Sequence, residues 1–318
     1  MLELLGDDRP LPPRYRDHAL AFPREALDRI LVDRARGLPI DVRERHRVTG
    51  LVRSADAVTG VRVQNEDGEP CEIAGRLVVG ADGRHSVVAS ALGLLRPHRL
   101  RRMALIQHVS GLEDIVDRGE IYLDPPDYAI LNPVAPGLVN LGLVVPMNHA
   151  RAFARRLEAF FHARLRQLRH LVPRLSAMKA EGRLMAMGPL AYRVAEPQAD
   201  GVMLVGDAAG FYDPFTGEGV FTALRSAELL TETAHAALSR GDLARDRLAG
   251  YATARCREFA SKSRVTHALQ LLIARRRLAN VVAHMLSRRP ALLDAVLGVF
   301  GDFVPPAELL SPANLRRV

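Results

Sequence analysis

The sequence predicts an α/β protein in which a second domain is inserted into the first, and three features lead to this prediction. Two apolar runs, within residues 71–83 and 201–207, each end in a glycine–aspartate turn and indicate buried strands. Between them, residues 100–195 contain a series of short strand-like segments that is typical of an antiparallel sheet. From residue 217 to about 304, apolar residues recur mainly at helical spacing.

Length and composition are those of a globular chain with roughly two domains. The 318 residues are 48% hydrophobic, so the chain can bury a full core. Cys71 and Cys256 are the only cysteines, and they form neither a disulfide framework nor a zinc-ligand spacing. Residues 1–20 do not resemble a signal peptide, and no run of 18 apolar residues indicates a membrane span. We therefore expect a cytoplasmic protein without a metal site.

The chain is basic, with a net charge of +8, and nearly all of the positive charge is arginine because Lys179 and Lys262 are the only lysines. The arginines are dispersed among acidic residues, and neither an aromatic–basic motif nor a zinc finger accompanies them. The sequence therefore predicts no nucleic-acid partner.

The first third of the chain predicts a helix and then a small sheet. The helix lies within residues 22–42, where Pro23 suits the first turn and Gly37 suits the C-terminal cap. Three strands should follow, with a hairpin turn at 66–68 before the last of them: residues 46–54, 57–65 and 71–83.

The remaining elements follow from the same patterns. A helix is expected at about 84–92, and one arginine-rich helix at about 149–169 should interrupt the antiparallel strands. After the strand at 201–207, a long helix should run from about 217 to 239. The last segment, 244–304, is helical in pattern and broken by Pro290.

Two aspartates at strand ends are the first candidates for a binding site. Asp82 and Asp207 each follow an apolar run and have glycine or alanine neighbours, which let a ligand approach the backbone. An ionised carboxylate only accepts hydrogen bonds, so it suits a ligand that presents hydroxyl groups, such as a ribityl or ribose chain. The alternative is that each aspartate caps the helix that follows it.

The segment Pro214-Phe-Thr-Gly-Glu-Gly219 opens the long helix and is a second candidate. Its glycines leave the backbone accessible, and the free N–H groups and positive dipole of a helix start favour an electron-rich partner. The alternative is an ordinary glycine-rich loop with Thr216 as the helix cap.

The segments FPREALDRILVDRA, LVVGADGRHSVV and GVMLVGDAAGFYDPFTGEGVFTALRSAELL occur in this order in the chain. Together they resemble the FAD-dependent aromatic hydroxylase (monooxygenase) superfamily, with the geranylgeranyl reductase-like branch nearest, over residues 20–310. The resemblance implies an FAD-binding, doubly wound domain like that of glutathione reductase. It also implies an inserted antiparallel-sheet substrate domain and a helical C-terminal region.

The resemblance also implies roles for single residues. Asp207 is similar to the carboxylate that holds the ribityl chain of FAD, and Asp82 and Gly83 are similar to the turn beside the pyrophosphate. Arg24 resembles a helix arginine that reaches the cofactor, and Val48 resembles the strand residue whose backbone meets the adenine. The implied cofactor site further includes two glycine-rich turns: Gly206, Pro214, Gly217, Glu218 and Gly219.

Residues 125–133, PPDYAILNP, are similar to the P-x-x-Y-x-W-x-F-P signature on the family's substrate wall. Pro125, Tyr128 and Pro133 fit the signature, whereas Ile130 and Asn132 replace its tryptophan and phenylalanine. The resemblance implies that Tyr128 contacts substrate, and the alternative is a structural tyrosine of a strand.

The family begins with a βαβ unit that carries G-x-G-x-x-G, and the sequence shows no such segment. We therefore expect a doubly wound domain that lacks its first βαβ unit, with apolar faces of neighbouring strands left uncovered. A misplaced gene start, a split gene whose partner chain supplies the unit, and a degenerate protein are the three alternatives.

By this resemblance, residues 1–98 form a partial FAD-binding domain, 99–195 the substrate domain, 196–240 the return to the first domain and 241–318 the helical region. The expected activity is NAD(P)H-linked flavin chemistry on a small hydrophobic substrate, either reduction of an isoprenoid-type double bond or hydroxylation of a phenolic or polyketide ring. No catalytic residue is assigned. The alternative is a fragment or relic that does not bind FAD on its own.

Two further interpretations concern three histidines and the C-terminal residues 266–300. His85, His108 and His149 are scattered and are interpreted as exposed or capping side chains. Residues 266–300 combine apolar stripes with arginines, which suits either peripheral contact with an anionic membrane or a helical cover for the other domains.

Overall fold

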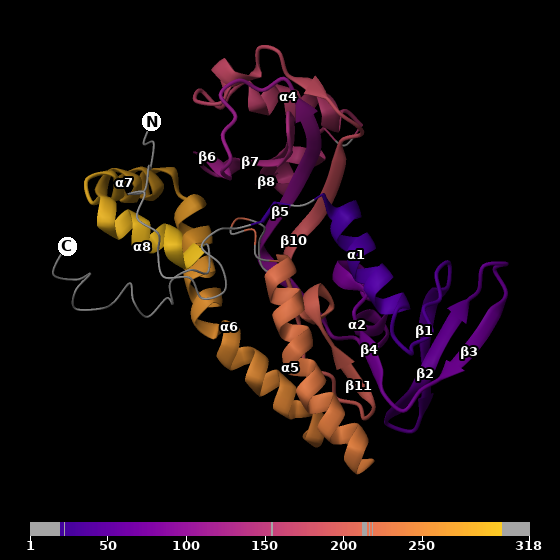
Figure 1. Ribbon diagram of the computed structural model, residues 1–318. Coiled ribbons are helices and arrows are strands. Elements are labelled where there is room, and N and C mark those ends of the chain that lie inside the picture. The colour runs from indigo at the N-terminus through magenta and orange to yellow at the C-terminus, as the bar shows by residue number, and fades with distance from the viewer. Residues whose placement is uncertain are drawn as a thin grey trace. The chain divides into compact units, whose positions relative to one another are not determined.

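The computed structural model describes residues 20–21, 23–153, 155–211, 215, 217 and 219–300 (Figure 1). The chain divides into two compact units. Unit 1 comprises Met1–Val32, Leu100–Leu190 and Ser261–Val318, and unit 2 comprises Asp33–Arg99 and Ala191–Ala260. Each unit is therefore built from segments that are far apart in the sequence.

Unit 2 contains two small sheets. The first is antiparallel and has the order β1-β2-β3, with β1 (Arg47–Ser54), β2 (Ala57–Gln64) and β3 (Pro70–Ala74). The second is a parallel pair of β4 (Val78–Gly80) and β11 (Val202–Leu204). The prediction of one strand over 71–83 is wrong, because the chain changes partners between Gly75 and Val78. Gly75 N–H donates to the carbonyl of Thr59, whereas Val78 N–H donates to that of Gly201.

A short helix, α2 (Val87–Ala91), packs against the parallel pair. Gly80 makes this approach feasible, since a Cβ at that position would lie 2.6 Å from Leu204 Cδ2 and 3.0 Å from Val88 Cβ. Val88, Val202 and Leu204 are buried together in the core of unit 2. Val79, in contrast, points away from this core and is 40% exposed.

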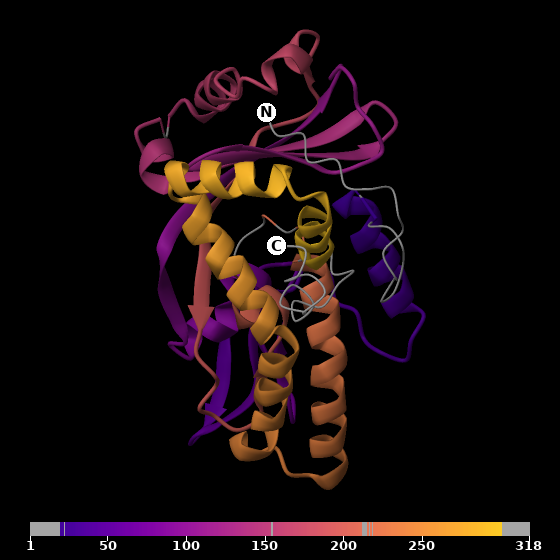
Figure 2. The ribbon, with the colours of Figure 1, turned by 90° about the vertical axis from the view of Figure 1, so that its left-hand side faces the viewer.

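Two long helices complete unit 2: α5 (Gly219–Arg240) and the first part of α6 (Arg245–Ile273). They lie side by side (Figures 1 and 2). Leu229 and Leu230 of α5 pack with Leu248 and Tyr251 of α6, and Met203 of β11 joins the same cluster. The predicted helix at 217–239 is thus confirmed, with its start at Gly219.

Unit 1 contains the antiparallel sheet that the sequence predicts. Its main path is β10-β5-β8-β7-β6, β9 pairs with β5, and the bounds are as follows: β5 (Leu95–Ser110), β6 (Glu120–Asp124), β7 (Asp127–Ala135), β8 (Leu138–Pro146), β9 (Lys179–Ala180) and β10 (Met185–Val194). The pairings of β5 with β8, β7 with β8 and β6 with β7 are all antiparallel.

Two short helices cover one face of this sheet, α3 (Met147–Arg151) and α4 (Leu157–Leu165). The prediction of a single helix over 149–169 is wrong, because Arg156 has non-helical dihedral angles of φ −140° and ψ 39°. Phe161 and Leu165 of α4 are fully buried against Leu141 and Leu143 of β8. This contact forms the core of unit 1.

The other helices lie near the chain ends: α1 (Arg24–Arg36), α7 (Arg276–Ser287) and α8 (Pro290–Phe300). Gly37 follows α1, and its N–H donates to the carbonyls of Asp33 and Arg34, which confirms the predicted cap. Pro290 begins α8, so the predicted break in the helical tail is also confirmed.

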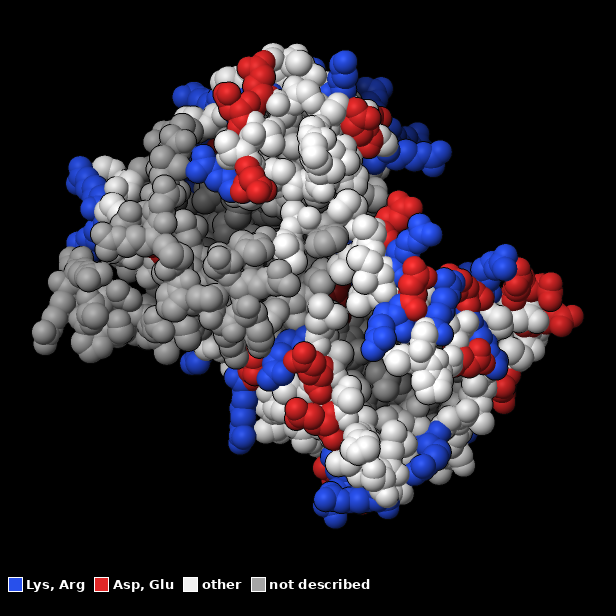
Figure 3. Space-filling model, in the orientation of Figure 1, with Lys and Arg blue, Asp and Glu red and all other residues white. Residues whose placement is uncertain are grey.

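Basic and acidic side chains are interspersed on the face of the molecule shown in Figure 3. Several arginines have acidic partners a few residues away: Arg24 with Asp28, Arg36 with Asp33, and Arg43 with Asp41. Part of the arginine charge is therefore balanced locally.

Candidate functional site: two turns at one sheet edge

The two strands that carry the candidate aspartates end at the same sheet edge. β4 and β11 run parallel, with Val78 opposite Val202 and Gly80 opposite Leu204. The pairing continues beyond the strands, because Val205 N–H donates to the carbonyl of Gly80 at 3.0 Å. The 3₁₀ turns that follow, Gly83–His85 and Gly206–Ala209, consequently pack against each other in unit 2.

Asp82 has a structural role in this turn. Its Oδ2 atom accepts hydrogen bonds from the N–H groups of Val87 at 2.6 Å and Val88 at 3.3 Å, so it caps the start of α2. Gly83 has a φ of +73°, and a Cβ there would meet no atom within 4 Å. The capping alternative therefore describes Asp82, and its predicted contact with FAD stays a prediction.

Asp207 lies in a turn that is held by hydrogen bonds from Tyr192. The hydroxyl of Tyr192 donates to the backbone carbonyl of Asp207. The Tyr192 backbone also pairs with that of Phe211, with N···O distances of 2.9 and 3.3 Å. Burial raises the pKa of Tyr192 far above its ordinary value, and the charge of Asp207 adds to the effect. The raised pKa favours the protonated hydroxyl, which is the form that donates to the Asp207 carbonyl.

Gly206 allows the same turn to pack closely against α5. Gly206 has a φ of +59°, and its N–H donates to Ser226 Oγ of α5 at 3.3 Å. A Cβ at Gly206 would lie 3.3 Å from Ala223 Cβ. Only a residue without a side chain combines this backbone conformation with so close a contact.

Arg84, a half-buried residue in the Gly83–His85 turn, is the second feature of this site. Arg84 Nε and Nη1 are buried and have no hydrogen-bond partner among the described residues. Burial is the main cause of the raised pKa of Tyr192; the charges of Asp207 and Asp82 raise it further, and that of Arg84 lowers it. Buried N–H groups of this kind call for acceptor oxygens. Sequence reasoning missed Tyr192 and Arg84, because neither belongs to a periodic pattern.

These residues fit an anionic ligand with hydroxyl groups, as FAD is. The unpartnered N–H groups of Arg84 match phosphate oxygens, and a carboxylate at 207 matches ribityl hydroxyls. Gly217 has a φ of +70°, and a Cβ there would also meet no atom within 4 Å. The loop before α5 is thus accessible at this glycine.

Other predicted cofactor residues lie elsewhere in the chain. Val48 is half-buried in β1, beside the register irregularity between Val48 and Gly50. Arg24 belongs to unit 1, where its guanidinium pairs with Asp28 at 3.0 Å. Gly219 is the first residue of α5. Pro214 and Glu218 lie outside the described residues, as does Thr216.

Tyr128, the predicted substrate residue, lies on β7 in unit 1. Its side chain is fully buried, and the guanidinium carbon of Arg102 lies 5.7 Å from the centre of its ring. Strand alternation places Ile130 and Asn132 on the same face of β7 as Tyr128. The substrate role of Tyr128 stays a prediction.

The described residues contain no group of three or more histidine, cysteine, aspartate or glutamate side chains that could hold a metal ion. None of their helices has both the length and the apolar character needed to cross a membrane.

Comparison with known proteins identifies the family. The profile of the FAD binding domain family matches residues 14–264. Curated relatives include digeranylgeranylglycerophospholipid reductases of two archaea. The one from Methanosarcina acetivorans is 28% identical over 232 residues, which cover 71% of this chain and 55% of that protein. The one from Methanothrix thermoacetophila is 30% identical over 254 residues, which cover 77% and 61%.

Solved structures share the fold. A geranylgeranyl bacteriochlorophyll reductase-like protein from Thermoplasma acidophilum aligns with a TM-score of 0.69 at 22% identity, covering 92% of this chain and 71% of that one. A flavoprotein/dehydrogenase from Cytophaga hutchinsonii aligns with a TM-score of 0.74 at 18% identity, covering 88% and 68%. The family match and the curated relatives confirm the resemblance stated from the sequence, and the solved structures agree with it in fold.

The chain spans a little more than half the length of the curated relatives it matches, 55% of the protein from Methanosarcina acetivorans, for example. The family match nevertheless includes both strand-end turns, and it extends over 251 of the 318 residues (264 − 14 + 1). The chain therefore belongs to the FAD binding domain family.

Proposed function

We propose that the chain is the FAD-binding and substrate-binding portion of an oxidoreductase that uses NAD(P)H as the electron donor and acts on a small hydrophobic substrate. One observation carries the proposal: the Asp82 and Asp207 turns meet at one edge of a parallel strand pair, and the first turn also carries Arg84, whose Nε and Nη1 are buried without a hydrogen-bond partner among the described residues. The family match supports the choice of FAD as the ligand of this edge.

In this proposal each group has a role set by its chemistry. Asp207 accepts hydrogen bonds from the ribityl hydroxyls, and Arg84 donates to phosphate oxygens. The start of α5 directs N–H groups and a positive dipole towards the electron-rich edge of the flavin ring. FAD itself supplies the hydride chemistry, so the protein's part is to hold the cofactor and to exclude water.

For the reaction, we favour reduction of an isoprenoid-type double bond over ring hydroxylation. The curated relatives at 28–30% identity are named as reductases of a digeranylgeranyl lipid. Tyr128 and Ile130 give one face of β7 a largely apolar character, although the family's two larger aromatic side chains are absent there. Reduction proceeds without oxygen and yields a saturated product, whereas hydroxylation consumes oxygen with NAD(P)H. Product analysis under nitrogen and in air separates the two.

The flavin assignment is tested by Asp207→Asn, which keeps the shape of the side chain and removes its charge. We expect FAD to bind at least about tenfold more weakly, because hydrogen bonds to charged groups contribute about 1.5–3 kcal/mol. Flavin fluorescence quenching measures the affinity. Asp246→Asn is the matched control, since this side chain of unit 2 is 91% exposed.

Two results would contradict the assignment. Equal FAD affinity in the two variants removes Asp207 from the site. A wild-type protein that binds no FAD supports the alternative of a fragment or relic. In that case, the DNA immediately upstream is examined for an in-frame strand followed by G-x-G-x-x-G, and a chain extended by that unit is titrated in the same way.

A further inference from the structure

A cavity of about 700 Å³ lies beside α3 and α4 in unit 1, and the proposed flavin chemistry does not use it. It is a groove open to solvent, because most of the residues that line it are exposed. Its walls are largely apolar because five alanine and phenylalanine side chains line it: Ala152, Phe153, Ala159, Phe160 and Ala163. The rings of Phe153 and Phe160 stack, with their centroids 4.9 Å apart. Pockets of about 300–1,000 Å³ with such walls bind drug-sized molecules.

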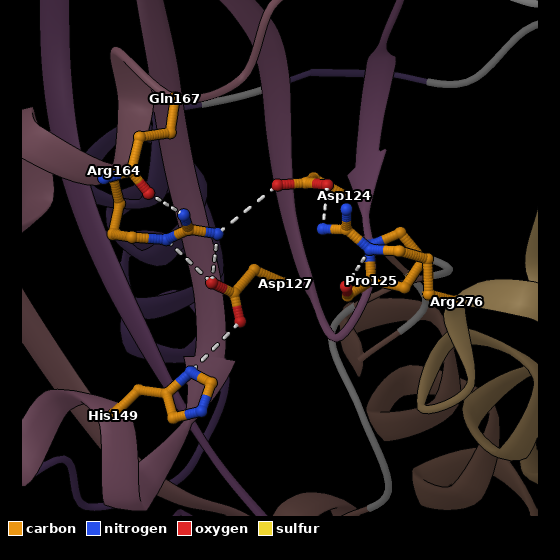
Figure 4. Close-up of polar contacts among 7 residues, drawn as sticks. All are labelled: Asp124, Pro125, Asp127, His149, Arg164, Gln167 and Arg276. Carbon is orange, nitrogen blue, oxygen red and sulfur yellow. Dashed lines mark hydrogen bonds and ion pairs between the residues drawn. The ribbon is translucent and has the colours of Figure 1, made fainter.

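Asp127 and Arg164 line one end of the cavity and belong to a network of charged side chains that Figure 4 shows. Asp127 Oδ2 accepts a hydrogen bond from Arg164 Nε at 2.8 Å, and Arg164 Nη2 lies 2.5 Å from the same oxygen. Arg164 Nη2 also lies 3.5 Å from Asp124, whose other carboxylate oxygen pairs with Arg276 at 2.6 Å. Two carboxylates are thus matched by two guanidinium groups.

The other oxygen of Asp127 is not satisfied in this network. Its Oδ1 atom is buried and has no hydrogen-bond donor among the described residues. The imidazole of His149 lies on this side, but its Nδ1 is 3.7 Å away, which is too far for a hydrogen bond. The Asp127 side chain is 2% exposed and lines the cavity. A buried acceptor without a donor is unfavourable, so this oxygen marks a position for a donor from a ligand.

We propose that this cavity binds a neutral, amphipathic alcohol or phenol. Its apolar ring or chain lies against Phe153 and Phe160, and its hydroxyl donates a hydrogen bond to Asp127 Oδ1. A cationic ligand fits less well, because Arg164 already matches the charge of Asp127 and Arg156 lines the same cavity. An anionic ligand fits less well because a carboxylate or phosphate has no proton to donate to Oδ1.

The test uses the full chain and three probes that share one ring system. They are 2-naphthol, 2-methoxynaphthalene, which lacks the hydroxyl proton, and 2-naphthoate, which is an anion. The chain contains no tryptophan, so the fluorescence anisotropy of the probes is measured without interfering emission from indole. We expect 2-naphthol to bind at least about tenfold more tightly than either analogue, because a site built to accept a hydrogen bond discriminates against ligands that cannot donate it.

Two variants test whether 2-naphthol binds in this cavity and contacts Asp127. Ala163→Leu adds bulk to the cavity wall without touching the carboxylate, and we expect it to abolish 2-naphthol binding. In Asp127→Asn, the side-chain carbonyl faces Arg164 and the amide NH₂ group takes the place of Oδ1. This NH₂ group cannot accept the hydrogen bond from the 2-naphthol hydroxyl, so we expect at least tenfold weaker binding. Ala291→Leu, at an exposed helical alanine outside the cavity, is the matched control and should bind as the wild type does.

The outcomes decide the proposal even where a variant is unstable. If Asp127→Asn fails to fold, Ala163→Leu and the three probes still test the cavity and the hydroxyl. Binding of 2-naphthol that persists in Ala163→Leu belongs to another surface and overturns the proposal. Equal binding of 2-naphthol and its methyl ether, or no binding of 2-naphthol by the wild type, overturns it as well. FAD affinity, measured in parallel, should not change in Ala163→Leu.

Discussion

At the scale of single residues, the Tyr192 hydroxyl and the backbone of Asp207 form the contact that most directly shapes the candidate site. The two aspartates could be found in the sequence because each ends an apolar run beside glycine. Tyr192 could not be found in this way, since its hydroxyl bonds a backbone carbonyl 15 positions further along the chain. Every residue has a backbone carbonyl, so the residue type at position 207 does not reveal that its carbonyl accepts this hydrogen bond.

The Tyr192 contact can be tested by Tyr192→Phe, which keeps the ring beside Phe211 and removes the hydroxyl. The Asp207 carbonyl then loses its donor, and we expect the free energy of unfolding to fall by about 1 kcal/mol. We also expect weaker FAD binding, because the turn that carries Asp207 is less firmly held. Urea unfolding and flavin titration measure the two effects. Wild-type values for both in Tyr192→Phe would show that the contact is incidental.

At the scale of elements, an ion pair holds the start of β6 to the segment before β9. Glu120 and Arg174 are 20% and 12% exposed, and Arg174 donates to both Glu120 and the hydroxyl of Tyr122. Burial acts to raise the pKa of Glu120, but the hydrogen bonds from Arg174 and Tyr122 outweigh it and leave the pKa below its ordinary value. The folded protein therefore favours the charged form of Glu120.

The lowered pKa of Glu120 gives a pH-dependent prediction. Because the pKa is lower in the folded state, the stabilisation is complete above the unfolded value of about 4.3 and is lost as the pH falls through the folded value. We expect Glu120→Gln to lower the free energy of unfolding by about 1–2 kcal/mol at pH 7. The difference from wild type should shrink as the pH is lowered from 7 to below the unfolded value of about 4.3. A difference that is constant over this range in urea unfolding would contradict the assignment.

The α7 helix presents an apolar stripe to solvent. Leu278, Val281 and Met285, at helical spacing, are 42%, 65% and 39% exposed, and the arginines Arg277 and Arg288 flank them. Of the two alternatives for residues 266–300, we propose peripheral contact with an anionic membrane through this stripe. The same periodicity is visible in the sequence, but the sequence alone does not show which apolar stripe remains uncovered.

For α7, the prediction concerns vesicle binding. Replacing Leu278, Val281 and Met285 by serine should reduce flotation with phosphatidylglycerol vesicles several-fold, because the apolar area that enters the interface is lost. Leu224→Ser is the control, since Leu224 is a leucine of α5 that is 48% exposed. Flotation that is equally reduced by the control, or unchanged in the triple variant, would contradict membrane contact through α7.

Element boundaries show where sequence patterns stop being informative. Residues 71–83 and 149–169 each look like one element, yet each contains two. In the first case the backbone exchanges one sheet for another, and in the second a non-helical Arg156 interrupts the helix. Both changes depend on partners distant in the sequence, so local propensity cannot place them.

At the scale of the whole molecule, the parallel sheet is small for a doubly wound domain. Only β4 and β11 form it among the described residues, and Val79 of β4 is 40% exposed. The sequence leads us to expect that the first βαβ unit is missing and that neighbouring strands keep uncovered apolar faces, and this expectation stays a prediction. We propose that a further segment, on the same or on a partner chain, covers this surface.

This proposal is tested by supplying the unit. A βαβ segment with a G-x-G-x-x-G turn, encoded upstream or by a neighbouring gene, should raise the melting temperature and the FAD affinity when it is co-expressed with the chain. The fluorescence of an apolar dye bound to the chain should fall at the same time. Dye binding and melting temperature that do not respond to the added segment would contradict the proposal.

The pairing of β4 with β11 also has a consequence for how the protein is made. Val78 and Val202 are opposite each other in the sheet but 124 positions apart in the chain (202 − 78). A growing polypeptide therefore exposes Asp82 long before the strand that completes its surroundings has left the ribosome. A nascent chain arrested before that strand emerges would contain the Asp82 turn without the Asp207 turn. We expect such a chain not to bind the cofactor.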